Sequence, residues 1–123
     1  MSADYFAQYW TRPGWQAHLL RWNDSIAGFA LVETSEAVAG AMELADLFVL
    51  QRFRRRGIGQ QVARHFMSTR QVPWTVVIFD EARDAQAFWS ALFKDPRLAP
   101  SRQVPDPDGR DVKTYVLEPT FAA

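Results

Sequence analysis

Apolar residues follow two different periods along this chain, and the change of period divides it into elements. Short apolar runs bounded by turn residues predict strands at residues 15–22, 26–32, 42–50, 74–79 and 112–117. Helical spacing of apolar residues predicts helices at residues 3–10, 59–70 and 85–93. The Pro- and Asp-rich stretch at residues 97–110 contains Asp108-Gly109, which predicts the turn of a C-terminal hairpin.

The order of these elements predicts one domain over residues 1–123 with an α/β (α+β) fold. The unit from Met42 to Phe79 runs strand, helix, strand, which requires a right-handed crossover and parallel pairing. The hairpins on either side of this unit are antiparallel. We therefore expect a mixed, mostly antiparallel central sheet with a parallel strand–helix–strand core, flanked by helices.

Composition narrows the class of function. Hydrophobic residues make up 48% of the chain and aromatic residues 14%, so it can build a core. The formal net charge is zero, which argues against a long polyanion such as nucleic acid as the partner. With no cysteine and two histidines on different segments, disulfides are excluded and no metal site is predicted. The aromatic residues near the N-terminus are predicted to be core rather than the wall of a pocket: Tyr5, Phe6, Tyr9, Trp10 and Trp15.

The sequence also predicts the cellular location of the protein, because it lacks the patterns of secretion and membrane insertion. The first residues lack a basic start followed by an apolar stretch, so no signal peptide is predicted. The longest apolar run, Ile26 to Val32, is too short to span a bilayer. We expect a cytoplasmic protein with no membrane partner.

One motif carries specific chemistry: a basic turn with two glycines lies between a predicted strand and a predicted helix. It reads Arg54-Arg55-Arg56-Gly57-Ile58-Gly59, after the apolar run at residues 47–50. A helix start presents unpaired N–H groups and a partial positive charge, and arginines add charge-assisted hydrogen bonds. The turn therefore predicts an anion site, with a nucleic-acid surface as the alternative.

The motif and its flanking elements resemble the GNAT superfamily of acetyl-CoA-dependent N-acetyltransferases. Residues 54–59 fit the family's Q/R-x-x-G-x-G/A signature, and residues 85–89 (Ala-Gln-Ala-Phe-Trp) fit its A-x-x-F-Y or A-x-x-F-W helix. The resemblance covers residues 15–123. It implies an enzyme that transfers acetyl from acetyl-CoA, as co-substrate, to a small-molecule or peptide amine by direct attack.

The resemblance also implies site residues. The cofactor would lie against the strand end, the signature turn and the later helix, which gives the set Phe48, Val49, Arg54, Arg55, Arg56, Gly57, Ile58, Gly59, Gln60 and Trp89. Glu43 lies on the strand where many members place a carboxylate, so it is the predicted general base. Asp46 and a water chain are the alternatives, and both carboxylates could be ordinary exposed strand residues.

The chain departs from the family pattern in ways that favour a second hypothesis. The family's usual first strand and helix have no counterpart before residue 15, so a second subunit could cover the exposed sheet edge in a homodimer. An asparagine common in the family aligns with Ala82. Trp89 stands where members often have a tyrosine acid, and indole cannot deliver a proton near neutral pH. The alternative is a catalytically degenerate module that binds CoA or another protein.

Overall fold

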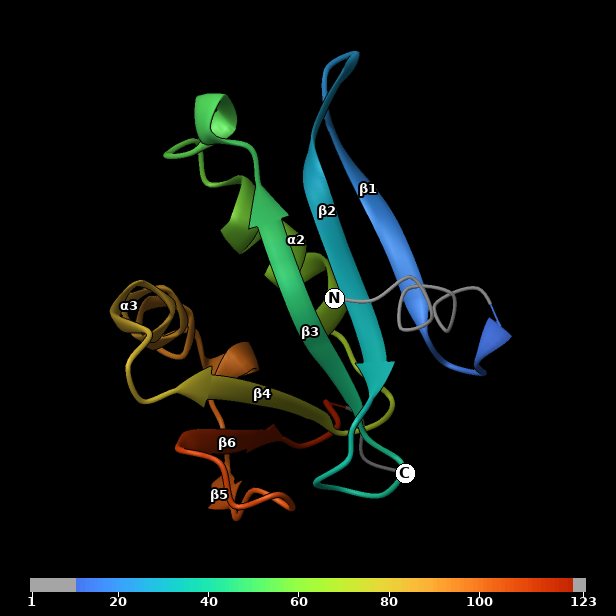
Figure 1. Ribbon diagram of the computed structural model, residues 1–123, viewed down its shortest axis with the longest axis vertical. Helices are drawn as coiled ribbons and strands as arrows, with labels where there is room; N and C mark the ends of the chain where they lie inside the picture. The colour runs from blue at the N-terminus through green and yellow to red at the C-terminus, as the bar shows by residue number, and fades with distance from the viewer. Residues whose placement is uncertain (1–10, 121–123) are drawn as a thin grey trace.

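The computed structural model describes residues 11–120, which form one six-stranded sheet covered by two α-helices (Figure 1). The strands are β1 (Gln16–Trp22), β2 (Ser25–Thr34), β3 (Met42–Val49), β4 (Trp74–Phe79), β5 (Arg102–Val104) and β6 (Val112–Leu117). The helices are α2 (Ile58–Met67) and α3 (Arg83–Leu92), with short 3-10 helices η1 (Gln51–Phe53) and η2 (Pro96–Leu98). The helix predicted at residues 3–10 lies outside the described residues.

The sheet is mixed, as the sequence predicts. Its strand order is β1-β2-β3-β4-β6-β5, in which β3 and β4 are parallel and every other neighbouring pair is antiparallel. Helix α2 makes the crossover between the two parallel strands. The C-terminal hairpin enters the sheet through β6, which lies between β4 and β5. The sequence predicts this hairpin but not which of its strands pairs with β4.

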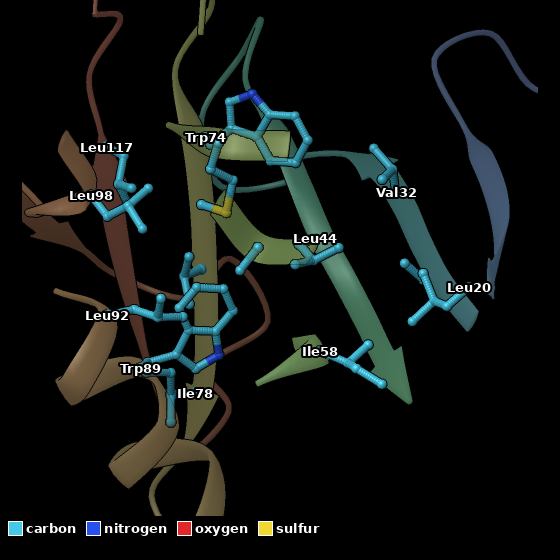
Figure 2. Close-up of a cluster of buried hydrophobic side chains, with 14 of the residues drawn as sticks. Leu20, Val32, Leu44, Ile58, Trp74, Ile78, Trp89, Leu92, Leu98 and Leu117 are labelled. Carbon is cyan, nitrogen blue, oxygen red and sulfur yellow. The ribbon is translucent and has the colours of Figure 1, made fainter. Parts of the chain in front are cut away.

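Both α-helices pack on the same face of the sheet and share one core. Figure 2 shows Trp89 and Leu92 of α3 beside Ile78 of β4, with Leu44 of β3 pointing into the same layer. Ala63 and Met67 of α2 are fully buried in this cluster. These residues recur every three or four positions on the helices and every second position on β4, so the periods that predict the elements also select the buried faces.

The opposite face carries a smaller cluster of Trp15, Leu31 and Phe29. Trp15 is 8% exposed and its Nε1 donates to Thr34 Oγ1 at 3.1 Å. This residue is therefore core, as the sequence predicts, whereas the other N-terminal aromatics lie outside residues 11–120.

The periphery of the fold shows where one helix stops and where one sheet edge lies. Helix α2 ends at Met67, three residues before the predicted end, because the buried Arg70 side chain donates to the carbonyl oxygens of Met67, Arg97 and Glu118. Strand β1 forms one edge of the sheet, and Leu19 on it is 64% exposed. Within residues 11–120 no helix is long and apolar enough to cross a membrane.

Candidate active site

The parallel strands β3 and β4 are paired over only two positions. Met42 pairs with Trp74 and Glu43 with Thr75, after which the strands separate. Figure 1 shows the divergence: β3 and β4 start together and then run in different directions. The pairing thus ends at Glu43, six residues before the end of β3 at Val49. From Leu44 to Val49, no described strand pairs with the β4-facing edge of β3, and we call this unpaired strand edge the slot.

A bulge in β3 decides which side chains face this slot. Val32 pairs with Leu44 but Leu31 pairs with Asp46, so Ala45 is an extra residue in β3. Without the bulge, residues three apart on a strand would point to opposite faces. Because of it, Glu43 and Asp46 lie on the same face, opposite the helices. The pattern of the sequence gives no sign of this shift.

Glu43 occupies the closed end of the slot. It is half-buried, and its Oε1 accepts a hydrogen bond of 2.8 Å from Thr75 Oγ1. Burial raises the pKa of the Glu43 carboxyl above its usual value, the Thr75 hydrogen bond opposes that rise, and Glu33 and Glu36 add to it. A carboxyl whose pKa is shifted upward by its surroundings is suited to accept a proton near neutral pH.

The competing carboxylate, Asp46, has a different environment. Its side chain is exposed, and it lies three residues further along β3 where no strand flanks the slot side. Glu43 is therefore the carboxylate at the point where the slot closes, and Asp46 is a solvated residue of the same face. The alternative that both carboxylates are ordinary exposed strand residues therefore describes Asp46 but not Glu43.

The other end of the slot is the turn into α2. Gly57 is the N-cap of α2 and has a φ of 75°, a left-handed conformation that favours glycine. The first intrahelical bond runs from Gln61 N to Gly57 O at 3.0 Å, so the N–H groups of Ile58, Gly59 and Gln60 point out of the helix end. No acidic residue lies in the first turn of α2. The predicted anion site is thus built largely by the backbone.

The three arginine side chains of the turn are exposed, and those of Arg54 and Arg56 contact aromatic rings. Arg54 Nε donates to Val49 O at 2.9 Å, and its guanidinium lies 5.6 Å from the Phe48 ring centre. The Arg56 guanidinium lies 5.9 Å from the ring centre of Trp22. Arg55 has a φ of 65°, which is unusual for a residue with a side chain. These contacts hold positive charge around the start of α2.

Two glycines allow close packing around the turn. A Cβ on Gly28 of β2 would lie 1.9 Å from the Phe48 carbonyl oxygen, so β2 can approach the end of β3 only without a side chain. A Cβ on Gly59 would lie 3.1 Å from Phe88 of α3. Gly59 is therefore suited to helix packing, whereas the space around Gly57 is open. Phe48 itself stacks on Phe29 with ring centres 5.4 Å apart, on the face away from the helices.

Trp89, the last of the predicted cofactor residues along the chain, lies in the core. It is 8% exposed and packs between Phe88 and Phe93, with ring centres 5.2 and 5.9 Å away. Its place on α3 is therefore explained by packing. The structure also brings in two residues that the sequence did not suggest, Thr75 and Ser35. A threonine in a β-branched run and a serine in a loop carry no local signal of a site.

The length of the slot is set by strand geometry. The seven steps from Glu43 to Leu50 span roughly 23 Å at about 3.3 Å per residue. One end holds a half-buried carboxylate and the other holds free N–H groups with arginines. An extended ligand with an anionic group at one end and a reactive group at the other matches these two ends.

Comparison with known proteins decides the family. The sequence profile of the acetyltransferase (GNAT) family matches residues 1–92, three quarters of the chain. The chain belongs to the GNAT acetyltransferase family. Comparison with curated protein sequences gives no significant match.

Solved GNAT structures share the fold of this chain. An acetyltransferase from Thermus thermophilus is 21% identical with a TM-score of 0.70, covering 92% of this chain and 70% of that one. The ribosomal-protein-S18-alanine N-acetyltransferase from Escherichia coli is 19% identical with a TM-score of 0.69, covering 100% and 80%. A GNAT acetyltransferase from Elizabethkingia anophelis with acetyl-CoA bound is 15% identical with a TM-score of 0.65, covering 95% and 83%. The six-stranded mixed sheet with two helices is thus the GNAT fold, and acetyl transfer is the chemistry of the family.

Proposed function

We propose that this protein is an N-acetyltransferase that moves acetyl from acetyl-CoA to a primary amine by direct attack, with Glu43 as general base. One observation carries the proposal: β3 and β4 separate immediately after Glu43 and Thr75. The carboxylate therefore lies at the closed end of a slot whose open end is the cationic start of α2. An acyl donor held at both ends would present its thioester to Glu43.

The cofactor would bind along the slot without a metal. Its pyrophosphate would accept hydrogen bonds from the N–H groups of Ile58, Gly59 and Gln60, with Arg54, Arg55 and Arg56 supplying charge. Its pantetheine arm would lie along β3 beside Phe48 and Val49, whose β4-facing edge pairs with no strand among the described residues. The Val49 carbonyl oxygen already accepts a hydrogen bond from Arg54 Nε. An amide of the arm that bonds this carbonyl would displace Arg54 toward the phosphates.

The reaction then needs a base more than an acid. An ammonium substrate must lose a proton to Glu43 before its nitrogen attacks the thioester carbon. The new C–N bond forms as the C–S bond breaks, the CoA thiolate leaves with the bonding electron pair, and the second proton lost by the nitrogen neutralises this thiolate. A thiolate is a stable leaving group near neutral pH, so a buried Trp89 in place of a tyrosine does not prevent turnover.

The acceptor is a small-molecule or peptide amine that approaches from the face opposite the helices, where Glu43 lies. We also propose a cytoplasmic location and, at the edge strand β1, pairing with a second subunit. These last two points are supported by the sequence pattern and by the exposed Leu19.

Calorimetry with acetyl-CoA and CoA release in the presence of a panel of amines test the proposal. We expect micromolar-range binding and amine-dependent release of CoA. Binding without release for any amine would instead support the degenerate CoA-binding module. No binding at all would overturn both, and salt-sensitive binding of DNA or RNA would then favour a nucleic-acid role for the arginines.

A further inference from the structure

Three polar side chains from three separate elements meet at the closed end of the slot. Thr75 on β4 lies 2.8 Å from Glu43 on β3, measured from Oγ1 to Oε1. The same Thr75 oxygen lies 2.9 Å from Oγ of Ser35, in the loop after β2. Ser35 Oγ also accepts the N–H groups of Ala37 and Val38 at 3.2 Å each. The result is a continuous chain of hydrogen bonds that ends on the carboxylate.

The number of protons fixes the direction of this chain. Thr75 has one hydroxyl proton, and an ionised carboxylate can only accept, so Thr75 donates to Glu43 and accepts from Ser35. Ser35 then uses its single proton on Thr75 and both of its lone pairs on backbone N–H groups. Each hydroxyl donates its single proton, and the donated hydrogen bonds run from Ser35 through Thr75 to Glu43.

We propose that Thr75 is a positioning residue for Glu43 in the acetyl transfer proposed above, and that Ser35 fixes the orientation of the Thr75 hydroxyl. The inference rests on the proposed function of Glu43 as the base. Thr75 is fully buried and is paired on both sides, with Glu43 and with Val116. It therefore gives a flexible glutamate a rigid partner. In residues 11–120 no protein donor contacts the other oxygen, Oε2, which is left to take the proton.

Thr75 also opposes the groups that would protonate Glu43. Burial raises the pKa of the carboxyl most, and the negative charges of Glu33 on β2 and Glu36 in the following loop raise it further. The Thr75 hydrogen bond is the larger of the two causes that lower the pKa, and Arg110 in the β5–β6 loop is the other. Loss of the Thr75 hydroxyl should therefore shift the acid limb of the rate profile to higher pH.

Thr114 provides a matched control on the neighbouring strand. It is 1% exposed and lies on β6 opposite Val77, but its buried Oγ1 has no hydrogen-bond partner within residues 11–120. Thr75→Val and Thr114→Val both replace a buried hydroxyl of the same sheet by a methyl group. They differ in the hydrogen bonds of that hydroxyl to Glu43 and Ser35, so Thr114→Val controls for the exchange of a buried hydroxyl for a methyl group in this sheet.

The test is the pH profile of kcat/KM for wild type, Thr75→Val, Thr75→Ser and Thr114→Val. We expect Thr75→Val to move the acid limb upward and to lower the rate below its midpoint by about tenfold, because a charge-assisted hydrogen bond is lost. Thr75→Ser keeps the hydroxyl and Thr114→Val leaves Glu43 untouched, so both should keep the wild-type limb. A uniform loss at every pH in Thr75→Val would overturn the inference.

A second measurement separates this inference from the proposed function. The carbon-13 signal of the Glu43 side-chain carboxyl, followed by NMR against pH, reports the protonation of Glu43 in a protein with or without turnover. Wild type that titrates at a lower pH than Thr75→Val supports the positioning role even if no amine is acetylated. Identical titrations of the two proteins overturn it. Ser35→Ala, with a smaller shift expected in the same direction, serves if Thr75→Val does not fold.

Discussion

The two ends of the slot along β3 are built in different ways. At the open end, the turn around Gly57 is made of consecutive residues, and its proposed binding groups are backbone N–H groups and exposed arginines. At the closed end, Glu43 depends on burial and on Thr75 and Ser35, which are 32 and 8 residues away in sequence. The proposed anion site can thus be built by a local motif, whereas the environment of the proposed base requires elements brought together by the fold.

The comparison has a practical consequence. A change at the open end should alter the affinity for the cofactor, and a change at the closed end should alter the rate of the chemical step. Each variant below changes one end and leaves the other intact.

The largest effect is expected from Glu43→Gln. The amide keeps the size of the side chain but cannot accept the substrate proton, so kcat/KM should fall by roughly 10²–10⁴-fold. The affinity for acetyl-CoA, measured by calorimetry, should not change. Asp46→Asn, on the same face of the same strand, is the matched control and should have little effect. Equal losses in the two variants would mean that Glu43 is not the base.

The next effect is expected from the double variant Arg54→Ala and Arg56→Ala. Removal of two charges beside the start of α2 should weaken acetyl-CoA binding by roughly tenfold to a hundredfold, with kcat little changed. S-acetylpantetheine lacks the pyrophosphate and is the control ligand. If its affinity falls as much as that of acetyl-CoA, the arginines do not act on the phosphates.

Gly57→Ala should have a smaller effect. It tests whether glycine is needed for its left-handed backbone conformation or for the lack of a side chain. Gly57 and Gly40 both have positive φ, 75° and 79°, and a Cβ on either would meet no atom within 4 Å. Each alanine variant should therefore lose about 1–2 kcal/mol of stability in thermal or denaturant unfolding. Only Gly57→Ala should also weaken acetyl-CoA binding. A loss of affinity in Gly40→Ala as well would point to general destabilisation.

The smallest effect concerns the pH dependence of stability. Because the folded protein raises the pKa of Glu43, the folded state binds this proton more tightly than the unfolded state. The contribution of Glu43 is therefore fully favourable below the unfolded pKa and is lost as the pH rises through the folded pKa. Relative to Glu43→Gln, the free energy of unfolding of wild type should fall as the pH rises through the folded pKa, as measured by urea unfolding at a series of pH values. A difference that is constant with pH would contradict the cause assigned here.

Much of the fold could be predicted from the sequence because its elements are strongly periodic. The strand at residues 74–79 is predicted with its observed ends, and the helices differ from α2 and α3 by only a few residues at each end. The differences have identifiable causes. Arg70 donates to the carbonyl oxygens of Met67 at the end of α2 and of Arg97 and Glu118 in distant segments, and residues 51–53 form a 3-10 turn that no periodicity marks.

The candidate site divides in the same way. Residues 54–59 are contiguous, so their spacing alone predicts a turn and an anion site, and the resemblance to GNAT enzymes adds the cofactor. Glu43 is suggested by the resemblance, but nothing in the sequence ranks it above Asp46. The bulge at Ala45 places both on one face, and the short pairing of β3 with β4 places Glu43 alone beside Thr75; both features are properties of strand register. Register depends on contacts between distant segments, which a single sequence does not display.

The sequence by itself therefore determined the elements, the family and the cationic turn, because each is written in residues that are close together in the chain. The tertiary structure decided where the slot opens, which carboxylate lies at its closed end and which hydroxyl holds that carboxylate. These depend on burial and on cross-strand distances of a few ångströms, which exist only after Ser35, Glu43 and Thr75 have been brought together by folding.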